Sequence, residues 1–243
     1  MIRIKLVFLS FIFLSNNSFA NCAINTDVLG AQYKITSSLP EKQTASVRHM
    51  ALWRNSNQVA HQYSDTHITE VWEKMSNGKL RMVRNFDEHQ RGIEYEPGEI
   101  KTSHNKSDWE TKSQLISNGL IGTMQLISST GNGCEKLEKY TLNKDGIEIR
   151  LQWLANKKLI KTYTVKSASA KVKWELQNIH SETSQVKKIF ATRSNYYTTD
   201  YTDVGDNESD PFLMKMINLG FVAHGASGMY DQHGNALDSR HGH

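Results

Sequence analysis

The chain is short of the residues and motifs that most often reveal a function. It has two cysteines and three prolines. Beyond its N-terminal segment it has no apolar run long enough for a transmembrane helix, and its few prolines exclude a Pro-rich linker. The G-x-S-x-G elbow, the H-E-x-x-H zinc motif and the P-loop are all absent. The sequence therefore assigns no catalytic residue and no cofactor.

The N-terminal segment has the three parts of a secretory signal peptide. Arg3 and Lys5 are its positive region, residues 6–14 are a short apolar stretch, and Ser18 and Ala20 are the small residues before a cleavage site. We predict cleavage after Ala20, so that residues 1–20 are removed. An uncleaved anchor or a buried strand is the alternative. The mature protein is then expected to be periplasmic or secreted.

Cleavage leaves both cysteines, Cys22 and Cys134, in the mature chain. An even cysteine count in an exported chain predicts a disulfide, which would tie the N-terminal end to the middle of the domain. Two free thiols with a redox or copper role are one alternative, and a lipid anchor on Cys22 is another. Asn21 precedes Cys22 where a lipoprotein has Gly or Ala, which disfavours the anchor.

The charge of the mature chain is close to neutral. The formal charge is +4, and removing the two basic residues of the signal leaves +2. Nucleic-acid binding needs a clustered basic surface, and no such cluster is evident along the sequence. We therefore expect no nucleic-acid partner.

Turn signals and alternating apolar residues predict two antiparallel meanders, over residues 44–96 and 135–192. In the second, the Asp145-Gly146 turn places Leu142 opposite Ile149. In the first, Asn77-Gly78 is expected to place Trp72 opposite Val83. We predict a mainly β (α+β) fold, a curved antiparallel sheet or half-barrel with two or three short helices. Residues 21–223 are expected to be one β-rich domain, with an irregular His- and Gly-containing tail at 224–243.

Two helix starts are evident. Residues 107–110 (Ser-Asp-Trp-Glu) fit a capping box, and a helix is expected from there to residues 118–119. Asp210-Pro211 fits an N-cap followed by a proline in the first turn, with Gly220 as the natural stop.

The hairpin around residues 55–57 carries the candidate ligand pocket. With a symmetric register, His61 lies opposite Ala51 and diagonal to His49, on one face with Trp53 and Tyr63. Together with Trp72, these residues would form a pocket for a metal, a haem or an amphipathic ligand (His49, Trp53, His61, Tyr63, Trp72). Two core histidines satisfied by hydrogen bonds are the alternative, and a slip of one residue would move the rings to the other face.

Two further segments carry candidate metal ligands. An acidic stretch offers oxygen ligands of the kind that calcium prefers (Asp203, Asp206, Glu208, Asp210), although its spacing is not that of an EF-hand and acidic residues also cap helices. The tail offers imidazoles that suit zinc, copper or nickel (His224, His233, His241, His243). The alternative for the tail is a solvated end.

The pattern of strands resembles the LolA/LolB-type β half-barrel family. The stretches that carry the likeness are residues 151–154, 160–163 and 172–179, and it extends over residues 30–195 as a pattern without a diagnostic motif. The resemblance implies a curved sheet that wraps helices and holds an acyl chain, and it assigns no functional residue.

Three functions follow from these features. The leading one is a non-enzymatic carrier of a small apolar or amphipathic ligand, with that ligand or another exported protein as the partner. The alternatives are a metal- or haem-handling accessory protein and a hydrolase that uses His89 or the pair Glu94 and Glu96.

Overall fold

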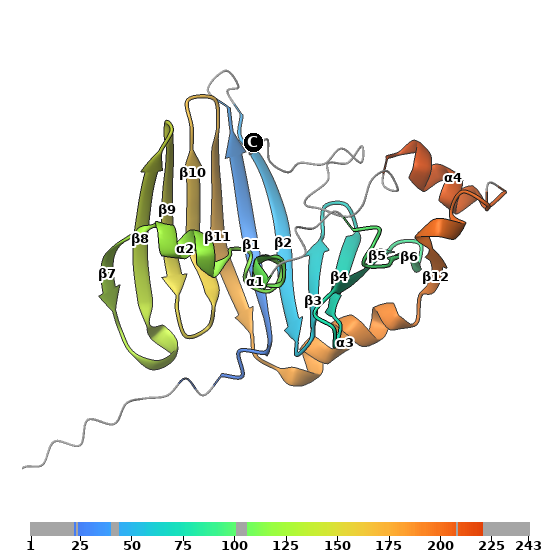
Figure 1. Cartoon of the computed structure of the whole chain (residues 1–243), viewed down its shortest axis with the longest axis horizontal. Coiled ribbons are helices and arrows are strands. Elements are labelled where there is room, and N and C mark those ends of the chain that lie inside the picture. The colour runs from blue at the N-terminus through green and yellow to red at the C-terminus, as the bar shows by residue number, and fades with distance from the viewer. Residues whose placement is uncertain (1–21, 23, 40–43, 101–105, 208, 221–243) are drawn as a thin grey trace, which may run out of the picture.

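A computed structural model describes residues 22, 24–39, 44–100, 106–207 and 209–220 (Figure 1). The expected signal peptide and the His-bearing tail lie outside the described residues. The described chain forms a curved, open sheet of twelve strands in the order β12-β6-β5-β4-β3-β2-β1-β11-β10-β9-β8-β7. Neighbouring strands are antiparallel except for β12 and β6, which are parallel. The predicted fold class is confirmed.

The strands run as follows: β1 Val28–Ser38, β2 Ser46–Asn55, β3 Gln58–Tyr63, β4 Ile68–Lys74, β5 Leu80–Phe86, β6 Arg91–Tyr95, β7 Gln125–Thr130, β8 Leu137–Lys144, β9 Ile147–Leu154, β10 Leu159–Lys166, β11 Lys171–His180 and β12 Tyr197–Asp200. The α-helices of the described residues are α1 Lys106–Gln114, α2 Asn118–Thr123, α3 Thr183–Ser194 and α4 Pro211–Asn218. None of them has the length and apolar character needed to cross a bilayer.

The two faces of the sheet are covered by different helices. Because alternate residues of a strand point to opposite faces, the register assigns each side chain to one of them. We call the face that carries Tyr33, Leu52 and Trp72 the major face, and the face that carries Ala51 and Trp53 the minor face. Side chains of α1, α2 and α4 pack on the major face, and those of α3 pack on the minor face.

The major face carries two apolar clusters. One lies over β4 to β6 and includes Trp72 and Leu213 of α4, and the other lies over β1 to β3, β9 and β10 and includes Leu52. Trp109 of α1 packs against both clusters. Figure 1 shows α1 and α2 in front of the sheet. The segment that joins the two meanders therefore also joins the two halves of the core.

The turn residues explain which predicted registers are right. At Asp145 and Gly146 both φ angles are positive, 51° and 76°, as a two-residue type I′ turn requires, and Leu142 pairs with Ile149 as predicted. At Gly78 (φ 81°) the loop has three residues, since the Met75 N–H donates to the Lys79 carbonyl over 2.9 Å.

The extra residue in the Gly78 loop is the bulge that commonly closes three-residue hairpins. It shifts the register by one, so that Trp72 pairs with Met82 and not with Val83. The predicted pairing of this hairpin is therefore wrong by one residue.

Two helices begin close to where their caps were expected, whereas α3 takes the place of the end of the predicted meander over residues 135–192. The Asp210 carboxylate accepts hydrogen bonds from the N–H groups of Phe212 (2.8 Å) and Leu213 (3.4 Å), and Pro211 opens α4. The helix that begins near the capping box stops early, because Leu115 has a φ of 65°. A second short helix, α2, then starts at an N-cap, the Ser117 hydroxyl, which accepts from the Leu120 N–H.

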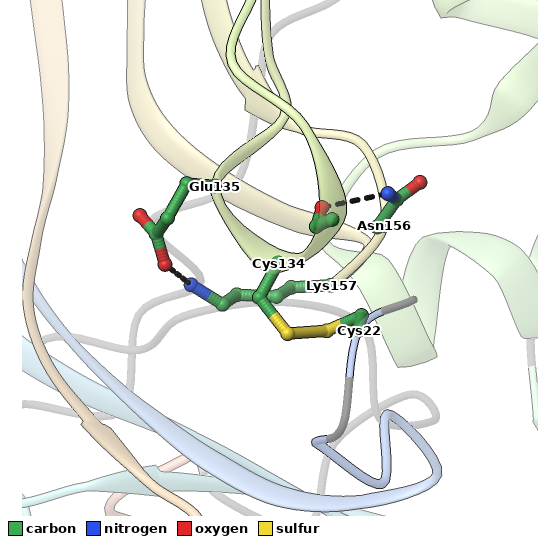
Figure 2. The surroundings of a disulfide bond; sticks show 6 residues. Cys22, Cys134, Glu135, Asn156 and Lys157 are labelled. Carbon is green, nitrogen blue, oxygen red and sulfur yellow. Dashed lines mark hydrogen bonds and ion pairs between the residues drawn. A yellow bond between two sulfur atoms is a disulfide. The ribbon is translucent and has the colours of Figure 1, made fainter. Parts of the chain in front are cut away.

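The predicted disulfide between Cys22 and Cys134 is present (Figure 2). Cys134 lies in a single 3-10 turn between β7 and β8. The neighbouring loop is fixed by Lys157, whose ammonium contacts the Glu135 carboxylate over 2.7 Å, and by Asn156, whose amide donates to the Gly133 carbonyl. The bond therefore ties the N-terminal segment to the region where the last two strands of one sheet edge meet.

Candidate functional site

The five residues of the predicted pocket lie on two faces of the sheet. The turn at Ser56-Asn57 has two residues and pairs Asn55 with Gln58, so His61 lies opposite Leu52 and not opposite Ala51. The symmetric register is therefore wrong by one residue, the slip that moves every side chain of a strand to the other face. His61, Tyr63 and Trp72 lie on the major face, and His49 and Trp53 on the minor face.

His61 is buried between the sheet and α1. Its Nε2 lies 2.7 Å from the Lys112 carbonyl oxygen, so Nε2 carries the proton and donates. Burial, and next the nearby Lys112 ammonium, lower the pKa of His61 to about 4. A neutral imidazole therefore anchors α1 to the sheet, which is the core-histidine alternative for this residue.

The neighbours of His61 are charged: Glu70 and Arg84 are fully buried, and Lys112 is half-buried. The Glu70 carboxylate accepts from the Arg84 guanidinium over 2.9 Å, and both side chains are fully shielded from solvent. The Lys112 ammonium lies 3.8 Å from the centre of the Trp72 ring, a cation–π contact. These contacts hold α1 down on β3 to β5 and leave this part of the major face filled.

A different part of the major face remains partly open. On β8 to β11 the register aligns apolar side chains in two rows across the strands. These side chains are only half-buried, and all of them except Val165 pack against the cluster beneath α2. We call them the open apolar strip (Tyr140, Leu142, Ile149, Tyr163, Val165, Val172, Trp174).

The position of α2 explains why the strip is open. Figure 1 shows α2 crossing in front of β9 to β11, which extend well past it toward their hairpin turns. The row of Leu142, Ile149, Val165 and Val172 lies nearer those turns than the row of Tyr140, Tyr163 and Trp174. Covering an apolar sheet surface of this kind with an apolar group is favourable, because it removes apolar area from water.

The strip also carries polar groups. The Tyr140 hydroxyl donates to the Glu138 carboxylate over 2.7 Å, and burial together with this bond raises the pKa of Tyr140 to about 12. Burial also raises the pKa of Tyr163. Both phenols therefore stay neutral at physiological pH, so the strip presents hydrocarbon and uncharged hydroxyls, with the Glu138 carboxylate beside Tyr140.

The minor face carries a polar cleft of about 400 Å³ between α3 and β3 to β6. Arg81 lines this cleft and donates to Glu73 over 2.8 Å and to Glu94 over 2.7 Å. The hydrogen bond with Glu73 and the nearby carboxylates raise the pKa of Arg81. Glu94, one of the pair considered for acid–base chemistry, is thus engaged in an ion pair with Arg81.

The other candidate residues are dispersed. Asp210 caps α4 and forms an ion pair with Arg91 (2.8 Å), Asp203 accepts from Asn207 through its backbone carbonyl, and Glu208 lies outside the described residues. The four tail histidines, His224, His233, His241 and His243, lie outside them as well. Within the described chain, no three His, Cys, Asp or Glu side chains converge as a metal site requires.

Sequence reasoning found the apolar alternation of residues 135–176 but not the open apolar strip. The sequence signal for the strip was a series of strands with one apolar face, for which no helix of matching length was predicted as a cover. The part of the sheet that stays uncovered depends on where α1 stops, at Leu115. No residue that typically forms turns lies at this point, so the sequence does not indicate the change of backbone direction.

Comparisons with known proteins add a likeness in fold. No family model and no curated protein matches the sequence. Among solved structures, PNGF-II is 11% identical over 73% of this chain with a TM-score of 0.35, and this chain covers 32% of its length.

Two smaller proteins match over most of their own length. A DUF1329 family protein from Desulfovibrio piger is 4% identical over 64% of this chain and 86% of its own, with a TM-score of 0.33. A LolA superfamily protein from Nitrosomonas europaea is 8% identical over the same shares, with a TM-score of 0.26. The resemblance to the LolA-type half-barrel is thus present and weak, and it concerns the fold alone.

Proposed function

We propose that this chain is a non-enzymatic carrier that binds an amphipathic ligand, with the ligand's hydrocarbon chain on the open apolar strip. The carrying observation is that the side chains of the open apolar strip are only half-buried, whereas the apolar side chains of the same face on β1 and β2 are buried. A hydrocarbon chain is the simplest partner for such rows, because it contributes burial and requires no hydrogen bonds.

The curvature and the α1–α2 segment support this proposal. The sheet is open, and the side chains of the open apolar strip on β8 to β11 stay partly exposed to solvent. The anchor of α1, made by His61 and Lys112, keeps the other half of the major face closed. A ligand would therefore lie beside α2, where Leu120 and Ile121 already pack against the cluster.

We further propose that the carrier works outside the cytoplasm, as a periplasmic or secreted protein. The Cys22–Cys134 disulfide supports this, since such bonds persist in oxidising compartments. The signal-like residues 1–20 support it as well. N-terminal sequencing of the protein from its native host tests this part, with Asn21 expected as the first residue.

Two variants on adjacent residues of β10 test the ligand site. Val165 belongs to the open apolar strip, and Thr164 points to the minor face at the next position. Val165→Glu places a carboxylate in the path of a hydrocarbon chain, whereas Thr164→Glu places the same charge on the other side of the same strand. We expect Val165→Glu alone to lose the bound ligand.

The measurement is mass spectrometry of lipids extracted from natively purified protein, together with titration of a fluorescent fatty acid. Wild type and Thr164→Glu should retain lipid and bind the probe, and Val165→Glu should bind it at least tenfold more weakly. Lipid-free wild-type protein that also ignores the probe would overturn the proposal. Equal binding by both variants would place the ligand elsewhere.

A further inference from the structure

Basic side chains scattered in the sequence gather on the minor face behind the open apolar strip. Arg150 lies between Thr141 and Thr164 on the neighbouring strands, and Thr164 in turn pairs with Lys173. One row nearer the hairpin turns, Lys166 pairs with Lys171. We call this surface of β1 and β8 to β11 the basic face (Lys34, Lys139, Arg150, Lys166, Lys171, Lys173).

The basic face has a strong excess of positive charge. Two carboxylates share it, Glu148 and Glu175, which pair with Arg150 and Lys173. Six cations less two anions leave +4, as much as the formal charge of the whole chain. The Arg150 and Lys173 side chains are 72% and 42% exposed, so these charges reach solvent.

The shape and chemistry of the basic face indicate its partner. Five adjacent strands and three residue rows give a broad area of roughly 19 Å by 14 Å from ordinary strand spacing. Threonines alternate with the basic residues (Thr36, Thr141, Thr162, Thr164). In the described rows that hold these cations there is no aromatic side chain on which a nucleic-acid base would stack, and the stacked rings of Trp53 and His180 lie beyond Lys34, at Gly30.

We infer that the basic face docks this protein onto the surface of a bilayer that contains anionic phospholipids. A broad array of cations with hydroxyl donors between them complements the phosphates of a headgroup layer, and each cation near such a surface adds to binding. The major face of the same strands then points away from the bilayer. The inference goes beyond the carrier proposal, because it concerns the opposite face of the sheet and needs no bound ligand.

The experiment uses the mature, oxidised chain and sedimentation with vesicles. One set of vesicles is phosphatidylcholine alone, and the other is equal parts of phosphatidylcholine and phosphatidylglycerol. We expect binding to the second set alone and a steep loss of binding as salt is raised, since screening weakens charge attraction across a solvated interface.

Matched triple variants separate the basic face from net charge. Arg150→Gln/Lys166→Gln/Lys173→Gln removes three of its cations. Lys74→Gln/Lys79→Gln/Lys215→Gln removes three exposed cations elsewhere, with the same change in net charge. At about fivefold per cation, the first variant should bind anionic vesicles at least tenfold more weakly, and the second should bind like wild type. Unchanged thermal unfolding midpoints show that both variants remain folded.

Three outcomes overturn the inference: equal loss in both variants, equal binding to both sets of vesicles, or salt-dependent binding to single-stranded DNA in the absence of binding to vesicles. None of them bears on the carrier proposal, because the Val165→Glu comparison is made without vesicles. Conversely, a lipid-free wild-type protein that still binds anionic vesicles through Arg150, Lys166 and Lys173 would sink the carrier proposal and support the docking surface.

Discussion

The indole of Trp53 lies so close to Gly30 that a Cβ atom on Gly30 would sit 2.3 Å from two of its ring carbons. The two residues pair across β1 and β2, and His180 of β11 pairs with Gly30 on the other side. The Trp53 ring crosses the glycine and stacks on His180, with ring centres 5.3 Å apart. The lack of a side chain at Gly30 thus allows the Trp53 ring to pack against the backbone in the core of the minor face.

Gly30→Ala should destabilise the protein by about 1–3 kcal/mol, because the added methyl overlaps a buried ring that has nowhere to move. Urea unfolding followed by tryptophan fluorescence measures the change. Gly122→Ala in α2 is the control, since open space surrounds that position and alanine favours a helix over glycine by up to about 1 kcal/mol. Equal stability of Gly30→Ala and wild type would contradict the close approach.

Protonation of His61 should destabilise the fold as pH falls. The folded state holds the pKa of His61 at about 4, below the ordinary value of 6.5. The unfolded chain therefore binds the proton first, and stability rises with pH across this interval. The contribution of neutral His61 to the free energy of unfolding is complete above about pH 6.5 and declines as the pH falls toward about 4. Over this interval the change is roughly 3 kcal/mol at most.

His61→Gln should flatten this part of the stability profile, because a Gln amide still donates to the Lys112 carbonyl and does not titrate. Unfolding midpoints in urea across the same pH interval provide the measurement. His49→Gln is the matched control, because His49 is exposed on the minor face. A profile that keeps its slope in His61→Gln would assign the acid sensitivity to other groups.

The buried pair of Glu70 and Arg84 makes a third prediction. Glu70→Leu leaves the Arg84 guanidinium in the core without its carboxylate and should cost about 3–5 kcal/mol. The double variant Glu70→Leu/Arg84→Met removes both charges and should recover most of that loss. Chemical unfolding of the four members of this cycle tests both statements. A double variant less stable than Glu70→Leu would show that Glu70 and Arg84 are not each other's main partners.

Loss of the disulfide should lower stability by about 2–5 kcal/mol, since it closes a long loop in the unfolded chain. The bond joins residues 112 positions apart. The Cys22→Ser/Cys134→Ser variant and reduced wild type should unfold at the same urea concentration, well below that of oxidised wild type. A reducing agent that shifts the wild-type midpoint while leaving the variant unchanged confirms that the thiols alone are responsible.

Local signals allowed much of the fold to be predicted, and long-range geometry limited the rest. Asp145-Gly146 specifies its own turn and hence the β8–β9 register, and the two cysteines leave a single disulfide pairing. The registers at Ser56 and Gly78 were wrong by one residue, because a turn's length depends on backbone angles that its residues do not fix alone. The ligand pocket split across two faces as a direct result.

The basic face was invisible to sequence reasoning for a related reason. Lys139, Arg150, Lys166 and Lys173 occupy alternate positions on four different strands, and no two of them are neighbours in the sequence. They gather only when the registers of all these strands are known. The near-neutral charge of the chain concealed the local excess.

The path of the disulfide has a mechanical consequence. Cys22 and Cys134 close a covalent ring that contains β1 to β7, while β8 to β11 lie outside the ring in sequence yet between β1 and β7 in the sheet. A pulling force applied to the two ends of the oxidised chain passes through the sulfur bridge. It can extend β8 to β12, but it cannot lengthen the segment between the two cysteines, which are 112 positions apart. Reduction would release that hidden length and turn a short extension into a long one.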